Sequence, residues 1–245
     1  MTFVVLVIVG VIIAVVLTND DDTGDFNIRY VGNAKKYESF IKQGVNRWSS
    51  IGTGGVSIIF KIQDTISSVV IANTYGNTIT ISESIFKSQS SFLKVLTIAH
   101  EVGHVLGIGT WNTTNDVLVS GNLKYLSEVK YPLTAAAYID KVRPIGQTVP
   151  GPPLENGGHG GGSDLVHWED SVNLGMERDL MVYKISASSS VISIIDLTFL
   201  KEIGREVDLS QAQTLKGTLS SIIGEYVFGK EELHFKCGKI GRAHV

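Results

Sequence analysis

The hydrophobic positions of this chain follow two spacings, and each spacing predicts a type of element. Apolar residues three and four positions apart predict amphipathic helices over residues 34–48, 90–107 and 193–203. Short runs rich in β-branched residues, bounded by Gly, Asn, Asp and Ser, predict strands over residues 56–62, 68–73 and 78–82. Helices and strands thus occur within one continuous stretch, which predicts an α+β fold.

The middle and last helices have clear boundary signals. Ser90 or Ser91 can cap the middle helix, and Gly107 can end it because glycine readily adopts the left-handed backbone conformation. The last helix is predicted to begin after Ser193 and to end before Gly204. The predicted buried positions are Phe92, Val95, Leu96, Ala99 and Gly103 in the middle helix and Leu197, Leu200 and Ile203 in the last one.

The amino terminus carries a different pattern. Residues 3–17 are uncharged and almost entirely apolar, and an acidic segment follows them at once. As a helix the run would span roughly 23 Å, which suits a short membrane anchor or a long signal-peptide core. The run lacks a small-residue cleavage site and a basic flank, which favours an uncleaved anchor over a cleaved signal; a buried strand is a third reading. We therefore expect a transmembrane anchor or signal segment over 1–18, an acidic linker over 19–27, and a membrane-anchored extracytosolic or secreted domain after them.

The composition limits which partners and which metal ligands are possible for that domain. With 43% hydrophobic and 18% charged residues, the 245-residue chain can bury a sizeable core. Its net charge of -3 and the lack of a Lys and Arg cluster predict no nucleic-acid partner. Cys237 is the single cysteine, so an intrachain disulfide is excluded and a metal would need His, Asp, Glu or Tyr ligands. The Pro- and Gly-rich stretch 144–164 predicts an irregular surface loop, either a linker or the rim of a cleft.

The segment His100-Glu101-Val102-Gly103-His104 lies in the middle helix. Successive helical residues turn by about 100°, so His100 and His104 lie about 40° apart on one face and both imidazoles can reach one metal ion. Glu101 is placed beside them, where its carboxylate can take a proton from a water molecule and return it to a leaving amine. The motif predicts a zinc-dependent peptidase.

A third protein ligand is needed, because a catalytic zinc ion typically has three. The metzincin pattern places a histidine at position 110, where this chain has Thr110. Downstream, His167 stands in a His-Trp pair, and His159 stands in a glycine cluster that would give its ring little rigidity. A carboxylate could instead complete a gluzincin-type site, and the candidates are Glu155, Asp164, Glu169 and Glu177.

Several motifs together resemble the leishmanolysin-like metzincins, in which a long insertion separates the helix glycine from a third histidine in a His-Trp pair. The resemblance rests on H-E-V-G-H-V-L-G-I-G-T-W from His100, on V-P-G-P-P-L-E-N-G-G before His167, on D-L-M ending at Met181, and on the helix that follows. It covers roughly residues 34–208. It implies a zinc metallopeptidase domain over 28–215, in a small, disulfide-free form, with a twisted sheet, an active-site helix and a smaller C-terminal subdomain.

The resemblance also implies roles for individual residues. His100, His104 and His167 would bind one catalytic Zn²⁺, Glu101 would be the general base, and Met181 would form the Met-turn beneath the metal. Tyr183 has the spacing at which astacin-like metzincins place a tyrosine, and we expect it to be a possible oxyanion stabiliser. The expected partner is a protein or peptide substrate. Two alternatives stay open: a non-catalytic binding or adhesion module on a peptidase fold, and a zinc hydrolase of another amide or ester.

The carboxyl terminus is expected to be an extension over 216–245. Its last six residues, Ile-Gly-Arg-Ala-His-Val, match the translation of a common sequencing-library adapter. We interpret 240–245 as an artefact of a truncated gene fragment, and His244 is therefore no ligand candidate.

Overall fold

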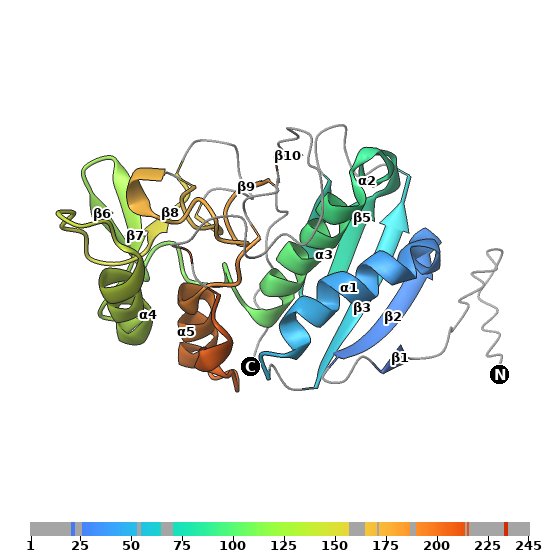
Figure 1. Cartoon of the computed structure of the whole chain (residues 1–245), viewed down its shortest axis with the longest axis horizontal. Coiled ribbons are helices and arrows are strands. Elements are labelled where there is room, and N and C mark those ends of the chain that lie inside the picture. Colours follow the sequence, from blue (N-terminus) through green and yellow to red (C-terminus); the bar gives the residue numbers. More distant parts are fainter. Residues whose placement is uncertain are drawn as a thin grey trace.

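The computed structural model describes residues 21–22, 26–52, 55–64, 71–156, 165–170, 172–186, 190–213, 215 and 233–234. Within them the fold is mixed α+β and contains a twisted mixed sheet, as the sequence predicted (Figure 1). The predicted N-terminal hydrophobic helix and the extreme C-terminal residues lie outside the described ranges. No helix among the described residues is long and apolar enough to cross a bilayer.

The main sheet has five strands in the order β1-β2-β3-β5-β4. β2 runs parallel to β3 and β3 runs parallel to β5, whereas β1 and β4 are antiparallel edge strands. Burial alternates along β2, as expected for a strand with one face on the core. The bounds of the strands are β1 Asp21–Asp22, β2 Phe26–Gly32, β3 Val56–Gln63, β4 Ala72–Tyr75 and β5 Thr78–Ser82.

The predicted strands at 56–62 and 78–82 are present as β3 and β5. The one expected at 68–73 is represented by β4, which extends to Tyr75, while residues 65–70 lie outside the description. β2 was not predicted as a strand. Because Phe26 and Asn27 belong to it and Asp21–Asp22 pairs with it, the sheet begins inside the segment that the sequence assigned to a linker.

Two long helices lie side by side across one face of this sheet (Figure 1). The chain enters α1 (Glu38–Ser49) through a 3-10 turn at Asn33–Tyr37, and α3 (Ser91–Leu106) follows the short α2 (Glu83–Ser88). Gly44 allows α1 to approach α3, since an added Cβ would lie only 2.9 Å from the carbonyl oxygen of Val95. Trp48 completes the contact by donating from Nε1 to the carbonyl of Ala99 at 2.7 Å.

The segments after α3 form a second part of the molecule, drawn to the left of the main sheet in Figure 1. It contains an antiparallel sheet in the order β6-β7-β8, a helix α4 that continues into a π-helical turn, and α5, which packs on α4. The bounds are β6 Val117–Ser120, β7 Leu123–Leu126, α4 Pro132–Ala137, the π-helical turn Tyr138–Val142, β8 Pro153–Leu154 and α5 Ile194–Glu202. Shorter elements are β9 Lys184–Ile185, which pairs with β10 Leu233–His234, and 3-10 turns at Val172–Leu174 and Leu209–Gln211.

The last helix begins and ends where the sequence indicated. Ser193 caps α5 in a capping box with Asp196, and Gly204 follows its end with a φ of 89°. Leu197 and Leu200 are buried as expected. Ile203 is instead 37% exposed, because it is the C-cap residue and the helix turns away there.

Candidate metal centre

The carboxyl-terminal half of α3 supplies three of the predicted site residues. Ser90 caps the helix by accepting from the backbone N–H of Leu93, and Gly107 ends it with a φ of 123°. His100, Glu101 and His104 are all at most 2% exposed. The helix signals in the sequence therefore place these side chains in the interior, at the junction of the main sheet and the second part of the molecule.

His167 reaches the same point from the second part of the molecule. Its Nε2 lies 3.1 Å from the Nε2 of His100 and 3.3 Å from that of His104, and the latter two atoms are 3.1 Å apart. Two ring nitrogens from α3 and one from a residue 63 positions beyond His104 thus form one small triangle. The structure therefore brings together the three residues that the sequence nominated as ligands.

The hydrogen bonds of the Nδ1 atoms determine which tautomer the two α3 histidines adopt. The Nδ1 atom of His100 donates to the carbonyl of Leu180, and that of His104 donates to the carbonyl of Ile108, both at 2.8 Å. Since a carbonyl only accepts, the proton of each neutral ring is on Nδ1 and the lone pair is on Nε2. Lone pairs therefore converge, an arrangement that a bound cation stabilises.

Burial also keeps these rings neutral. It lowers the pKa of His104 to about 4 and, together with the neighbouring histidines, holds the pKa of His100 well below its usual value. Neutral imidazole is the form that binds metals. His100, His104 and His167 thus make a buried group that could hold a metal ion.

None of the competing third ligands that the structure describes lies at this point. His159 and Asp164 lie outside the described residues. Glu155 and Glu169 gather with Asp170 in a separate acidic group, and Glu177 is not part of the histidine group. Among the described residues, the candidate metal-binding group therefore contains three histidines and no carboxylate.

Glu101 follows His100 in α3, and its carboxylate is held by the edge strand β4. The Oγ1 of Thr74 donates to its Oε2 at 2.6 Å, while Oε1 is buried and has no hydrogen-bond partner. Burial raises the pKa of Glu101 to about 7, and the hydrogen bond from Thr74 works in the opposite direction. The arrangement leaves one carboxylate oxygen available to accept a proton.

The sequence did not single out Thr74. It lies just after the predicted strand 68–73, and the alternation of β4 indicates only that it is buried. Its pairing with Glu101 depends on how the edge strand lies against α3, which no local pattern encodes.

Met181 packs directly against α3. A Cβ added to Gly103 would overlap Sδ of Met181 and lie 2.9 Å from its Cε and 3.0 Å from Cζ2 of Trp48. Met181 is fully buried, and its backbone N–H donates to Oδ1 of Asp179 at 2.7 Å. The methionine therefore fills the space beside the helix turn that joins His100 to His104.

Thr110 is exposed and closes the turn that follows α3. Its Oγ1 donates to the carbonyl of Gly107 at 2.6 Å. The next residue, Trp111, stacks on Trp168 with ring centroids 4.9 Å apart. The chain that leaves the helix thus packs on the residue beside His167 instead of providing a ligand itself.

A buried hydrogen-bond network supports the backbone around His167. Trp168 donates from its backbone to the carbonyl of Met181 at 3.1 Å and from Nε1 to Asp196 at 2.8 Å. Ser193 donates from Oγ to Asp179 at 2.5 Å and from its backbone to Asp196 at 3.0 Å. These contacts fix the His-Trp pair against both the turn at Met181 and the start of α5.

Both aspartates of this network have raised pKa values. Burial, followed by the proximity of Asp196, raises the pKa of Asp179 well above its usual value, and burial raises that of Asp196 to about 7. Neither residue was singled out from the sequence. The D-L-M motif and the S-x-x-D start of the last helix are the signals that could have found them.

Two further residues lie close to His167. The ring of Tyr183 is 5.9 Å from that of His167, centroid to centroid, so the predicted oxyanion residue is near the histidine group. Leu165 has a φ of 66°, which is uncommon for a residue with a side chain. Its backbone N–H donates to the carbonyl of Glu155, and its carbonyl accepts from Nε1 of Trp111. These contacts hold the strained segment that leads to His167.

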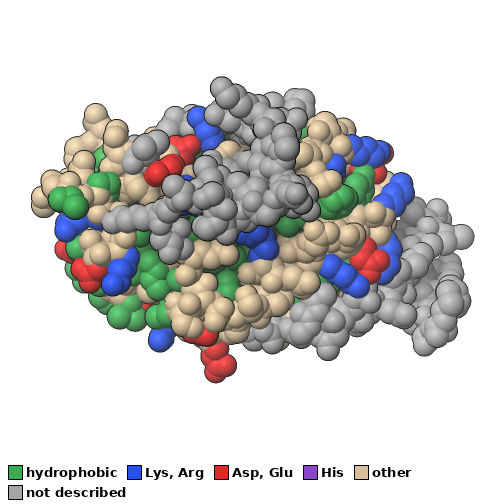
Figure 2. Space-filling view, in the orientation of Figure 1, with side chains coloured by type: hydrophobic (Ala, Val, Ile, Leu, Met, Phe, Trp, Pro, Cys, Tyr) green, Lys and Arg blue, Asp and Glu red, His purple; other side chains and the backbone are tan. Residues whose placement is uncertain are grey.

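On the face drawn in Figure 2, Lys and Arg of the described residues are interspersed with Asp and Glu, and no histidine is visible. The three histidines of the candidate metal centre are 0–2% exposed, in agreement with that view.

No protein-family model matches this chain, and comparisons with curated proteins and with solved structures likewise found no match. The geometry of the described residues and the motifs in the sequence are therefore what support a function.

Proposed function

We propose that this protein is a zinc-dependent endopeptidase of the leishmanolysin-like metzincin type. The observation that carries the proposal is the triangle of three Nε2 atoms, to which α3 contributes two histidines and also carries the buried Glu101. His100, His104 and His167 would hold the metal, and Glu101 would act on the water and the leaving group.

The dimensions of the triangle suit zinc. With Zn–N bonds of about 2.0–2.1 Å, ligand nitrogens in a tetrahedral site are roughly 3.3–3.4 Å apart. The observed separations of 3.1, 3.1 and 3.3 Å are close to that value. Three histidines with one position left for water or substrate are a known catalytic zinc arrangement.

A zinc ion bound there would act as a Lewis acid and make water nucleophilic near neutral pH. Glu101 would orient that water through Oε1, take its proton and later deliver the proton to the amine that leaves. Its pKa of about 7 suits both transfers, because a group that titrates near the working pH can accept and return a proton. Thr74 would keep the carboxylate in the orientation that these transfers need.

The positions of the other motif residues support the same family. Met181 packs against the helix turn between the two ligands, and Tyr183 lies beside His167. We propose that Met181 forms the Met-turn and that Tyr183 stabilises the oxyanion. The location outside the cytosol, anchored or secreted, and the protein or peptide substrate remain predictions from the sequence.

The test combines metal analysis with a cleavage assay on casein and a peptide library. The purified chain is expected to contain close to one zinc per molecule and to cleave peptide bonds. Glu101→Gln should retain the zinc and lose nearly all activity, because the amide cannot accept the proton. His167→Ala should lose the zinc as well.

Other results would support a different function or a different third ligand. Bound zinc with no cleavage of any peptide would favour a non-catalytic binding module. Cleavage of small esters or amides but no peptides would favour a different zinc hydrolase. Retention of zinc by the His167→Ala variant would move the third-ligand role to another residue.

A further inference from the structure

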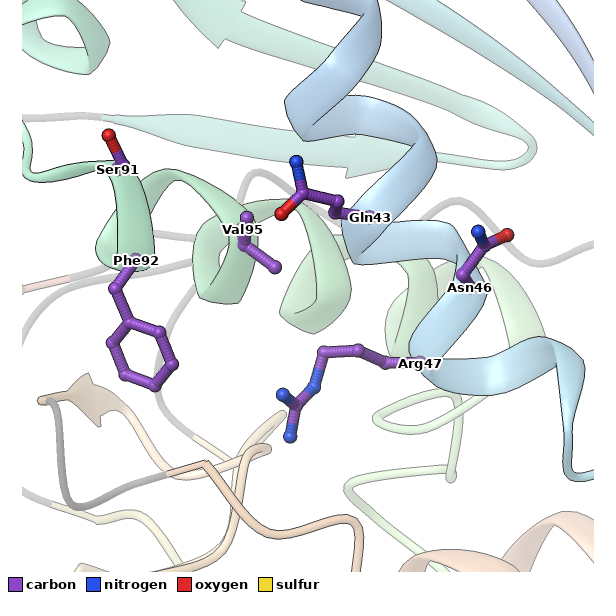
Figure 3. Close-up of a pocket in the computed structure, with 6 residues that line it drawn as sticks. All are labelled: Gln43, Asn46, Arg47, Ser91, Phe92 and Val95. Carbon is purple, nitrogen blue, oxygen red and sulfur yellow. The ribbon is translucent and has the colours of Figure 1, made fainter. Parts of the chain in front are cut away.

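A cavity of about 360 Å³ lies between α1 and α3, next to their close approach at Gly44. It is lined by Gln43, Asn46 and Arg47 from α1 and by Ser91, Phe92 and Val95 from α3. Figure 3 shows Phe92 and the guanidinium of Arg47 extending on the same side of the two helices. The volume is within the range of small-molecule sites, near its lower end.

Among the described residues, the cavity lining has one basic group and no acidic one. Arg47 is the single charged residue among the six described lining residues, and it forms no ion pair with any described carboxylate. Its one side-chain hydrogen bond among the described residues runs from Nη2 to the carbonyl of Ser190. A guanidinium has five N–H donors, so most of its capacity is unused.

Arg47 is also poorly solvated. Its Nε is buried without a hydrogen-bond partner, and burial lowers the pKa of the guanidinium. A partly buried charge that lacks a counter-ion is unfavourable, and binding an anion would offset that penalty. The cavity is the space from which an anion could approach it.

The remaining lining residues indicate which chemical group is attached to the anion. Phe92 and Val95 form the apolar part of the lining, while Gln43, whose side chain extends toward Val95, can donate from its amide. One guanidinium balances a single negative charge and can bind a carboxylate through two parallel hydrogen bonds. The cavity is larger than a carboxylate group, and the apolar part of the lining would contact an attached hydrocarbon group.

We propose that this cavity binds a monocarboxylate that carries an apolar or aromatic group, with Arg47 as its charge partner and Phe92 and Val95 as its apolar contacts. The lining residues of α3 occupy its first turns, whereas the metal-binding histidines occupy its last ones. The proposal therefore does not depend on whether the chain is a peptidase.

Isothermal titration calorimetry of the full chain tests this with three probes: 3-phenylpropanoate, N-acetylphenylalanine and the neutral 3-phenylpropanamide. Both carboxylates should bind, and the amide should bind at least tenfold more weakly. Binding of N-acetylphenylalanine alone would identify the end of a peptide chain as the ligand source. Binding of 3-phenylpropanoate alone would identify a free carboxylic acid. All titrations are repeated with the metal chelated, because a carboxylate could also bind at the histidine group; binding should survive chelation.

Variants locate the site. Arg47→Gln should weaken carboxylate binding at least tenfold, while Arg29→Gln, which removes an exposed positive charge from β2, should leave it unchanged. Val95→Trp, which fills the cavity and keeps the charge, should also abolish binding, and circular dichroism checks that each variant is folded. The proposal is overturned if no carboxylate binds, if the neutral amide binds equally well, if binding disappears with the metal, or if the folded Val95→Trp variant binds normally.

Discussion

Replacing Thr74 by valine would remove the hydroxyl that holds Glu101 and keep the shape of the side chain. The lost contact is a 2.6 Å hydrogen bond between two buried groups, Thr74 Oγ1 and Glu101 Oε2. A hydrogen bond to a charged group contributes about 1.5–3 kcal/mol. At 1.36 kcal/mol per tenfold change in rate, kcat should fall roughly 10- to 150-fold if the bond is needed in the transition state.

The assay is peptide hydrolysis measured over a range of substrate concentration and pH, with zinc content determined in parallel. KM and zinc content should change little, because Thr74 contacts neither a metal-binding histidine nor, in this proposal, the substrate. Its hydrogen bond lowers the pKa of Glu101, so its removal should raise that pKa and move the acidic limb of the kcat profile to higher pH.

Two variants serve as controls. Thr74→Ser retains a hydroxyl and should recover most of the activity, whereas Thr80→Val makes the same chemical change in the neighbouring strand β5 and should have little effect. A Thr74→Val enzyme with unaltered kcat and pH profile would refute the positioning role. A variant that loses zinc, or that serine cannot rescue, would show that Thr74 acts on the fold of the site instead.

Three further outcomes follow from the contacts of the histidine group. Gly103→Ala should destabilise the protein by about 1 kcal/mol, because overlap with Met181 costs about 1–3 kcal/mol and alanine recovers roughly 1 kcal/mol of helix propensity. Urea unfolding measures this change, and a variant as stable as wild type would contradict the packing of Met181 on Gly103. The pKa of His104 is lowered to about 4 in the folded state, so the unfolded chain binds more protons between pH 6.5 and 4. Stability and bound metal should therefore both decline as the pH falls through that window, and a flat thermal-denaturation profile there would exclude the neutral buried ring. Asp196→Asn should lower the free energy of unfolding by about 1–3 kcal/mol, because its single amide oxygen cannot replace both carboxylate oxygens that accept from Trp168 and from the backbone of Ser193. The variant should also lose zinc more readily to a competing chelator. Zinc retention equal to that of wild type would show that Asp196 does not support the site.

Local sequence signals predicted the ends of two helices. Ser90 and Gly107 mark the ends of α3, and Ser193 and Gly204 mark those of α5, as the capping residues and glycines in the sequence indicated. Caps act within one turn of the chain, so they can be recognised without knowledge of the rest of the structure. Strand β2 was missed, because it lies next to the acidic segment and only its pairing with β3 makes it part of the sheet.

The sequence by itself determined that His100 and His104 share one face of a helix, because helical periodicity relates residues four positions apart. It also determined that Glu101 directly follows His100 on that helix. It also favoured His167 over its rivals through a resemblance between motifs, without a physical measure of proximity. Tertiary structure alone decided that the Nε2 atom of His167 lies 3.1 Å from that of His100. It likewise paired Thr74 with Glu101 and left Arg47 beside a cavity with no acidic partner among the described residues. Such contacts join residues that are remote in the chain, and their distances depend on how whole elements pack together.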